Sequence, residues 1–194
     1  MIISFVNRKG GSGKTTSCAY IATCIAGTGK KVLCIDADNE QSLLKWQQSG
    51  ELTDIDVLAV TEDNLKATVK EQSKSYDAIL IDTPPNNAAV IHTASALSNG
   101  VIVTLSPSFQ DVLRLASTLS PIETIEELKG KALTSVLLTS AKTNTNILNE
   151  VRAELEANDI AVCDTVIYDR VKYQHHNISY LDEYMELCKE LEII

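Results

Sequence analysis

The stretch Asn7-Arg8-Lys9-Gly10-Gly11-Ser12-Gly13-Lys14-Thr15-Thr16 decides the fold of this chain. It follows an apolar run at residues 2–6 and precedes a stretch of small and apolar residues that reads as a helix. Glycines let the backbone adopt positive φ angles and come close to an anion. The N–H groups of such a loop, with those of the next helix start, form an anion-binding nest. The sequence therefore predicts a phosphate-binding loop between a strand and a helix.

Lys14 and Thr15 give this loop its chemistry. In a loop of this kind the lysine reaches the β- and γ-phosphates of a nucleotide, and the hydroxyl ligates Mg²⁺. The structural alternative is a glycine-rich turn with incidental lysines. The coincidence of Gly-Lys-Thr with a strand before it and a helix after it favours the phosphate loop.

Short apolar runs alternate with longer helix-like stretches along the rest of the chain. Several of the runs are apolar throughout, which is typical of strands buried on both faces of a parallel sheet. The order predicts an α/β fold, a single doubly wound, mostly parallel sheet with helices on both faces and right-handed crossovers. We expect strands at residues 2–6, 31–35, 55–60, 78–81, 100–105, 133–139 and 161–167, and helices at residues 15–27, 43–48, 64–73, 88–97, 112–128, 146–157 and 179–191.

The composition is that of an ordinary globular protein. A chain of 194 residues with 44% hydrophobic residues can bury a sizeable core, which excludes disorder. We find no linker or repeat and expect one domain over residues 1–194. No apolar run reaches the ~20 residues that a membrane span needs. The N-terminus lacks the features of a signal peptide, so the expected location is the cytoplasm.

The charge and the cysteines set two further expectations. The net charge of −9 means that nucleic acid would have to bind through a local basic patch, because phosphate contacts need clustered Lys and Arg. None of the five cysteines stands in a C-x-x-C pair. We therefore expect them to be buried, reduced side chains.

Three carboxylates follow predicted strands. Asp36 and Asp38 come at the end of the second strand, and Asp82 ends the apolar run 78–81 before Pro84-Pro85. Open α/β sheets bind ligands at the carboxyl ends of their strands. For Asp36 and Asp38 an acidic turn or helix cap is the structural alternative.

The phosphate loop departs from the standard G-x-x-x-x-G-K-[ST] pattern, because Arg8 stands at its first position. What fits is x-K-G-G-x-x-K-[ST], which resembles the deviant Walker A motif of the ParA/MinD family of P-loop ATPases. The resemblance implies that Lys9 reaches across a homodimer, with ATP sandwiched between two chains, to the partner's phosphates. A solvated surface lysine is the alternative. The implied nucleotide-binding residues are Lys9, Gly10, Gly11, Ser12, Gly13, Lys14, Thr15 and Thr16.

The two acidic segments resemble further motifs of the same family. Residues 36–40 resemble its D-x-D-P-Q switch, although Asn39 and Glu40 replace the Pro and Gln. Residues 76–85 resemble its Walker B segment. The resemblance implies that Asp38 positions the attacking water and that Thr15, Asp36 and Asp82 form the Mg²⁺ site. The implied catalytic residues are Lys9, Lys14 and Asp38.

Within the family, the chain resembles the short plasmid-partition (ParF-like) ParA proteins. It leaves no room for the N-terminal helix-turn-helix domain of larger members, and Ser106-Pro107-Ser108 with Asp111 resembles a P-S-P-L-D segment of the short type. The resemblance implies ATP hydrolysis that drives plasmid or chromosome segregation with a centromere-binding, ParB-like partner. It also implies nonspecific DNA binding, for which Arg170 and Lys172 are the local candidates.

Two alternatives of the same fold stay open. One is an ATP-dependent small-molecule enzyme, which would not require Lys9. The other is a MinD-like positioning ATPase, which would carry a basic amphipathic C-terminal helix. Residues 181–194 contain one lysine and five carboxylates, so anionic lipid would repel this segment and we expect no membrane partner.

Overall fold

The computed structural model describes residues 1–131, 134–143, 146–174, 178 and 181–194. Their core is a seven-stranded sheet with the order β3-β2-β4-β1-β5-β6-β7, in which every neighbouring pair is parallel. The predicted fold class is confirmed, and each predicted strand is present within three residues of its expected ends. The strands are β1 (Ile2–Val6), β2 (Val32–Asp36), β3 (Asp56–Ala59), β4 (Ala78–Asp82), β5 (Gly100–Leu105), β6 (Thr134–Ala141) and β7 (Val162–Tyr168).

The seven predicted helices are also present, and one short helix was not predicted from the sequence. That helix is α7, whose four residues are too few to show an apolar period. None of the helices in the described part of the chain is long and apolar enough to cross a bilayer. The helices are α1 (Lys14–Ala26), α2 (Ser42–Gln48), α3 (Glu62–Gln72), α4 (Ala88–Leu97), α5 (Phe109–Lys129), α6 (Ile147–Ala157), α7 (Val171–Gln174) and α8 (Asp182–Glu190).

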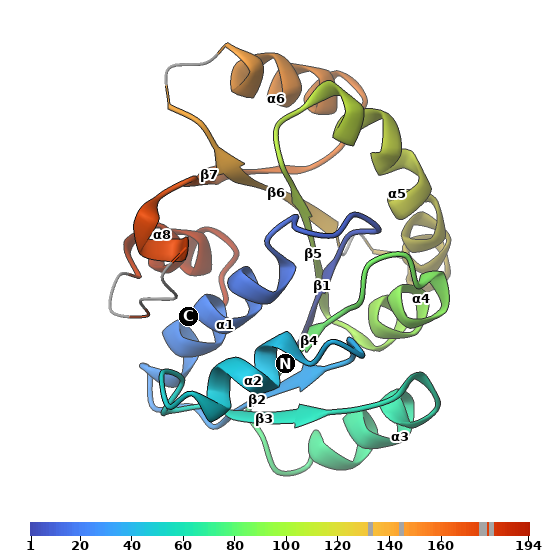
Figure 1. Cartoon of the computed structure of the whole chain (residues 1–194). Coiled ribbons are helices and arrows are strands. Elements are labelled where there is room, and N and C mark those ends of the chain that lie inside the picture. The colour runs from blue at the N-terminus through green and yellow to red at the C-terminus, as the bar shows by residue number, and fades with distance from the viewer. Residues whose placement is uncertain (132–133, 144–145, 175–177, 179–180) are drawn as a thin grey trace.

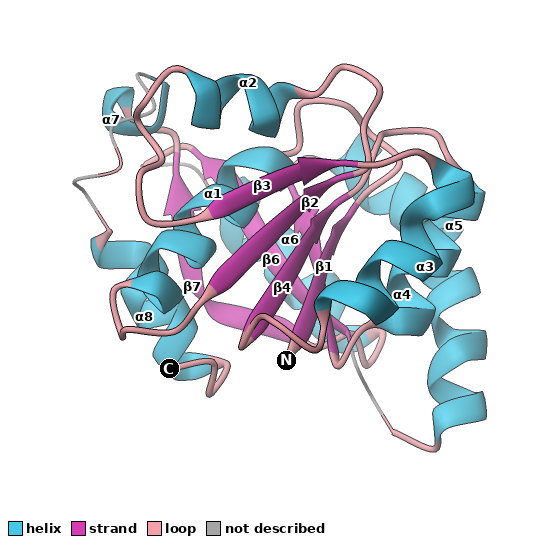
Figure 2. Cartoon of the chain, turned by 90° about the horizontal axis from the view of Figure 1, so that it is seen from below, coloured by secondary structure: helices cyan, strands magenta, loops and turns pink. Residues whose placement is uncertain are grey.

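Helices cover both faces of the sheet, as Figures 1 and 2 show. Alternate residues of each strand point to opposite faces. Phe5 of β1 packs in the cluster formed with α1, α2 and α8, whereas Val6 packs in the cluster with α5 and α6. The side chains of α3 and α4 complete the second face over β2 and β4. Because both faces are buried, the central strands are mostly apolar, and their few polar residues, such as Ser4 and Thr104, are buried as well.

The start of α5 differs from the sequence prediction. The helix begins at Phe109, three residues before the expected start, because the Ser108 hydroxyl accepts a hydrogen bond from the Asp111 N–H (3.2 Å). A serine at this position satisfies an N–H group that the first turn leaves free. The extra turn places Asp111 next to the phosphate loop.

Candidate functional site

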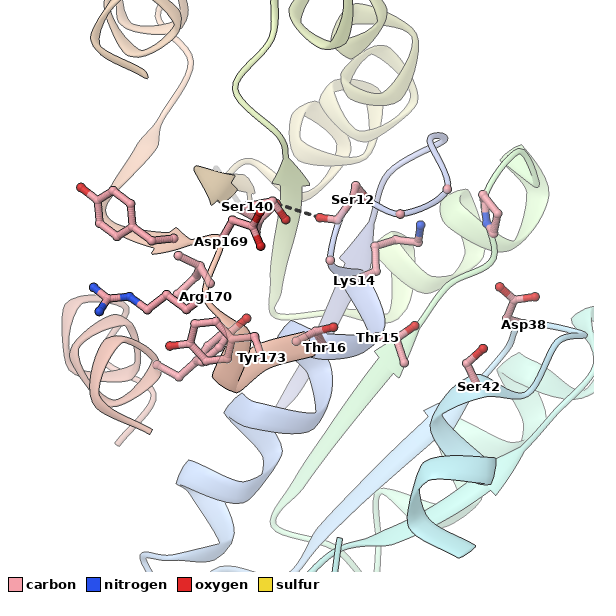
Figure 3. Close-up of a pocket in the computed structure, with 18 of the residues that line it drawn as sticks. Ser12, Lys14, Thr15, Thr16, Asp38, Ser42, Ser140, Asp169, Arg170 and Tyr173 are labelled. Carbon is pink, nitrogen blue, oxygen red and sulfur yellow. Dashed lines mark hydrogen bonds between the residues drawn. The ribbon is translucent and has the colours of Figure 1, made fainter. Parts of the chain in front are cut away.

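The strand order brings the three predicted segments together. β2, β4 and β1 are consecutive in the sheet, with Asp36 paired to Asp82 and Asp82 paired to Phe5 in the register. The loops that follow these strands therefore leave the same edge of the sheet side by side. A cavity of about 420 Å³ opens there, lined by residues 10–16 of the loop and by Asp38 among others. Figure 3 shows this cavity.

The loop is held open by its glycines and by two neighbouring strands. Gly11 and Gly13 have φ angles of +74° and +85°, a region that residues with a Cβ rarely adopt. A Cβ on Gly13 would also lie 3.4 Å from Thr139 of β6. The Thr139 hydroxyl donates to the Ser12 carbonyl (2.9 Å), and the Ser12 and Thr104 hydroxyls are 3.0 Å apart. These contacts fasten the loop to β5 and β6.

Lys14 opens α1 with its side chain folded back over the loop. Its amino group donates to the Lys9 carbonyl (3.1 Å), and only 6% of the residue is exposed. Burial lowers the pKa of Lys14, and the carboxylates of Asp82 and Asp38 oppose this effect. A buried ammonium group beside a glycine-rich loop and a helix start is suited to bind a polyphosphate.

Thr15 and Asp82 fit a magnesium ion. The Thr15 hydroxyl donates to Asp82 Oδ2 (2.6 Å), while Asp82 Oδ1 is buried without a hydrogen-bond partner. Burial raises the pKa of Asp82 to about 7. The described residues contain no cluster of three or more His, Cys, Asp or Glu that could hold a metal. The Thr15 hydroxyl and the Asp82 carboxylate suit Mg²⁺, because this ion keeps several waters and binds through one or two protein ligands plus substrate phosphates.

Asp36 has a different environment. Its carboxylate is fully buried and accepts hydrogen bonds from the N–H groups of Asp38 (3.1 Å), Leu43 (3.0 Å) and Leu44 (3.0 Å). Burial raises the pKa of Asp36, and the three N–H groups oppose this rise. Asp36 thus ties the acidic loop and the start of α2 to the end of β2. Its predicted contact with Mg²⁺ stays a prediction.

Asp38 lies at the mouth of the cavity. One carboxylate oxygen accepts a hydrogen bond from the Glu40 N–H (3.0 Å), and the side chain is partly exposed. Figure 3 shows Asp38 on the same side of the cavity as Lys14 and Thr15. This position is open to solvent water beside the expected phosphate end. The role of Asp38 in activating that water stays a prediction.

Lys9 does not point into this cavity. Its amino group forms an ion pair with Asp111 Oδ2 of α5 at 2.7 Å, and the side chain lines a neighbouring cavity of about 430 Å³ together with Arg8, Asn86 and Arg114. Nothing in the sequence pattern pairs Lys9 with Asp111, because the two residues are 102 positions apart.

The far end of the cavity was missed by the sequence analysis. Figure 3 shows Ser140, Asp169, Arg170 and Tyr173 there, opposite Asp38. Ser140 lies near the carboxyl end of β6, and the other three residues follow β7. The carboxyl ends of both strands share the sheet edge with β1. The sequence alone does not show which strands are neighbours, so it gave no signal that would have grouped these residues with the phosphate loop. The Tyr173 ring packs edge-on against Tyr20 (5.1 Å between centroids).

The two predicted DNA contacts are only partly described. Arg170 Nε lies 2.9 Å from Glu183 Oε1, with about half of the arginine side chain exposed. Lys172 belongs to α7, but its side chain lies outside the described residues. The DNA contact of these residues stays a prediction.

Comparison with known proteins gives a family match over most of the chain. Residues 3–180 match the family described as "CobQ/CobB/MinD/ParA nucleotide binding domain". The "ParA family protein MG470" of Mycoplasma genitalium is 25% identical, and the match covers 98% of this chain and 97% of that protein.

Two solved structures are similar in fold at low sequence identity. One is a "putative plasmid partition protein" from Borrelia burgdorferi B31 bound to AMPPNP, with a TM-score of 0.73, 19% identity, and coverage of 100% of this chain and 99% of the other. The second is a cobyrinic acid a,c-diamide synthase from Mycobacterium smegmatis with bound ADP and magnesium, with a TM-score of 0.76, 18% identity, and coverage of 97% and 95%. Neighbours of such different activities share the fold alone.

Proposed function

Because this chain belongs to the CobQ/CobB/MinD/ParA family of nucleotide-binding domains, we propose that it is a ParA-like partition ATPase. In this proposal one domain binds ATP and Mg²⁺, pairs with a second copy around the nucleotide and hydrolyses ATP slowly as a switch. The similarity over 98% of the chain to a ParA family protein supports the partition type. The AMPPNP and the ADP with magnesium in the two structural neighbours support the choice of ligands.

The position of Lys9 is the observation that carries the proposal. Among the described residues of one chain, Lys14 is the lysine that lines the cavity, whereas Lys9 extends along the outside of the loop to Asp111. The Lys9 side chain remains 41% exposed at this rim. A long, flexible cation in this place can contact a phosphate held by a second copy. This arrangement supports a shared site.

The chain's own residues divide the remaining work. Lys14 and the loop N–H groups bind the β- and γ-phosphates, and Thr15 with Asp82 holds the metal. Magnesium, when bound, neutralises phosphate charge and orients the γ-phosphoryl group. Asp38 accepts a hydrogen bond from the attacking water and aligns it with the phosphorus. Lys9 of the partner adds positive charge where negative charge spreads during transfer.

The cellular role follows from the partition type. We propose that the ATP-bound dimer segregates a plasmid or chromosomal locus together with a centromere-binding, ParB-like protein that stimulates hydrolysis. Arg170 and Lys172 are the proposed contacts to nonspecific DNA, which would place the dimer on the nucleoid in the cytoplasm. The ion pair between Arg170 and Glu183 means that DNA phosphate would compete with a carboxylate for this arginine.

A second candidate is an ATP-dependent enzyme that acts on a small molecule. The similarity in fold to the cobyrinic acid a,c-diamide synthase favours keeping it. Such an enzyme would use Lys14 and Asp82 in the same way, but its chemistry would not depend on Lys9 or on pairing of two chains.

ATP-dependent dimerisation separates the two candidates. Sedimentation with and without a non-hydrolysable ATP analogue would be measured for the wild type, Lys9→Ala and the control Lys66→Ala. Lys66 is an exposed lysine of α3, away from the cavity. We expect the analogue to dimerise the wild type and the control but not Lys9→Ala. A wild type that binds the analogue and stays monomeric would favour the small-molecule enzyme.

A further inference from the structure

We propose that Asp111 is a positioning residue that holds Lys9 inside its own chain, so that dimerisation must first break the Lys9–Asp111 ion pair. The proposal rests on the proposed function, because it concerns the step in which Lys9 leaves Asp111 of its own chain and contacts the nucleotide bound by the partner. In this view the Lys9–Asp111 contact stabilises the monomer and makes ATP-dependent dimerisation less favourable.

The ion pair joins two segments that are 102 positions apart in the sequence. Lys9 leaves β1 at the start of the phosphate loop, and Asp111 lies in the first turn of α5. The amino group and Asp111 Oδ2 are 2.7 Å apart, and only 3% of the Asp111 side chain is exposed. Lys9 is the one side chain bonded to this carboxylate among the described residues. The backbone of Lys9 is also held in place, because the Asn7 side-chain oxygen accepts a hydrogen bond from the Lys9 N–H (2.8 Å).

Removing Lys9 from this pair is unfavourable, because it leaves a buried carboxylate without its cation. Breaking one partner of a buried pair is costly since the other charge stays desolvated. The N–H groups at the start of α5 reduce that cost, because a helix N-terminus favours negative charge. Arg114 lines the same cavity one turn after Asp111. It makes no ion pair among the described residues, so it can compensate Asp111 after Lys9 departs.

A simpler role for the pair is to fasten the phosphate loop to α5. The two roles predict opposite effects when the carboxylate is removed. If the pair only fastens the loop, Asp111→Asn loosens the loop and weakens both nucleotide binding and dimerisation. If Asp111 restrains Lys9, the same change leaves nucleotide binding by the monomer intact and makes dimerisation easier.

The test measures ADP affinity by calorimetry and the dimer dissociation constant by sedimentation with a non-hydrolysable ATP analogue. We expect Asp111→Asn to bind ADP within about twofold of the wild type and to lower the dimer dissociation constant about tenfold, because two pairs are released per dimer. Asp111→Glu keeps the charge and should behave like the wild type. The control Glu123→Gln removes an exposed carboxylate from the same helix and should change neither constant. Asp111→Ser replaces Asp111→Asn if the latter does not fold.

The double variant Lys9→Ala/Asp111→Asn shows whether the effect acts through Lys9. It should stay monomeric at concentrations where Asp111→Asn is a dimer. If the wild type dimerises and Asp111→Asn dimerises equally or less well, the restraint on Lys9 is wrong and the proposed function stands. If neither protein dimerises, both proposals are wrong. If Asp111→Asn dimerises where the wild type does not, the restraint is supported.

Discussion

Replacing Asp82 with Asn should make the nucleotide-free protein more stable at pH 8, although it removes a residue of the proposed metal site. Burial raises the pKa of Asp82 from 3.8 to about 7, so at pH 8 the folded chain holds a desolvated negative charge. Between pH 4 and pH 7 the folded state binds more protons than the unfolded state. The free energy of unfolding therefore falls as pH rises through this window.

The size of the effect can be worked out from these pKa values. At about 1.4 kcal/mol per pKa unit, the ionised carboxylate costs about 4 kcal/mol at pH 8. Asn keeps an oxygen for the Thr15 hydroxyl, but its amide N–H₂ replaces Oδ1, which has no hydrogen-bond partner. A buried unsatisfied group costs about 1–3 kcal/mol. The net gain is then about 2 kcal/mol, or about 4–8 °C in Tm for a chain of this size.

Thermal unfolding of both proteins at pH 5 and pH 8, without nucleotide and with a chelator, measures this gain. At pH 5 Asp82 of the wild type is mostly protonated, so the gain should disappear. Equal differences in Tm at the two pH values would refute the assignment of this charge to Asp82, and so would a variant that is less stable at pH 8.

Three further predictions concern nucleotide binding and turnover. Lys14→Ala should lower ATP affinity in calorimetry by at least about a hundredfold, because it removes a buried, charge-assisted contact to phosphate; unchanged affinity would contradict the phosphate site. Asp38→Ala should bind ATP and dimerise but lose turnover in a phosphate-release assay, and retained hydrolysis would point to another group such as Glu40. Thr139→Val should weaken ADP binding several-fold, because losing the bond to the Ser12 carbonyl costs about 1–2 kcal/mol; equal affinity would show that the loop does not need this contact.

The sequence was sufficient to predict the strands of the sheet and to place the glycine-rich loop and the three carboxylates after them, because each of these rests on a local pattern. The roles of these residues stay predictions. The apolar run before Asp82 marks a strand buried on both faces, and Gly-Lys-Thr marks the start of a helix. Strand neighbours follow only from the folded sheet. The pairing of Asp36 with Asp82 in the register therefore had to come from the structure.

The contacts of Lys9 and Tyr173 could not be predicted from the sequence either, because they join segments that are distant along the chain. The partner of Lys9 is 102 residues away, on a helix whose first turn depends on the Ser108 cap. Tyr173 lies in the four-residue α7, which carries no periodic signal. Residues of one loop form a sequence motif with a fixed spacing. Residues that come together from distant loops have no fixed spacing, so a single sequence does not show that they are neighbours.

The central claim is that Lys9 acts in the site of a second copy, and mixing two inactive variants tests it most directly. In a heterodimer of Lys9→Ala and Asp38→Ala, both changes affect one site, and the other keeps its own Asp38 and receives Lys9 from the partner. An equimolar mixture should recover a measurable part of wild-type hydrolysis, at most about half, since one of the two sites in each mixed dimer is intact. Mixing Asp38→Ala with Lys14→Ala should recover nothing, because those changes disable different sites. No recovery with Lys9→Ala in dimers shown to be mixed, or full activity of Lys9→Ala alone, would contradict the claim.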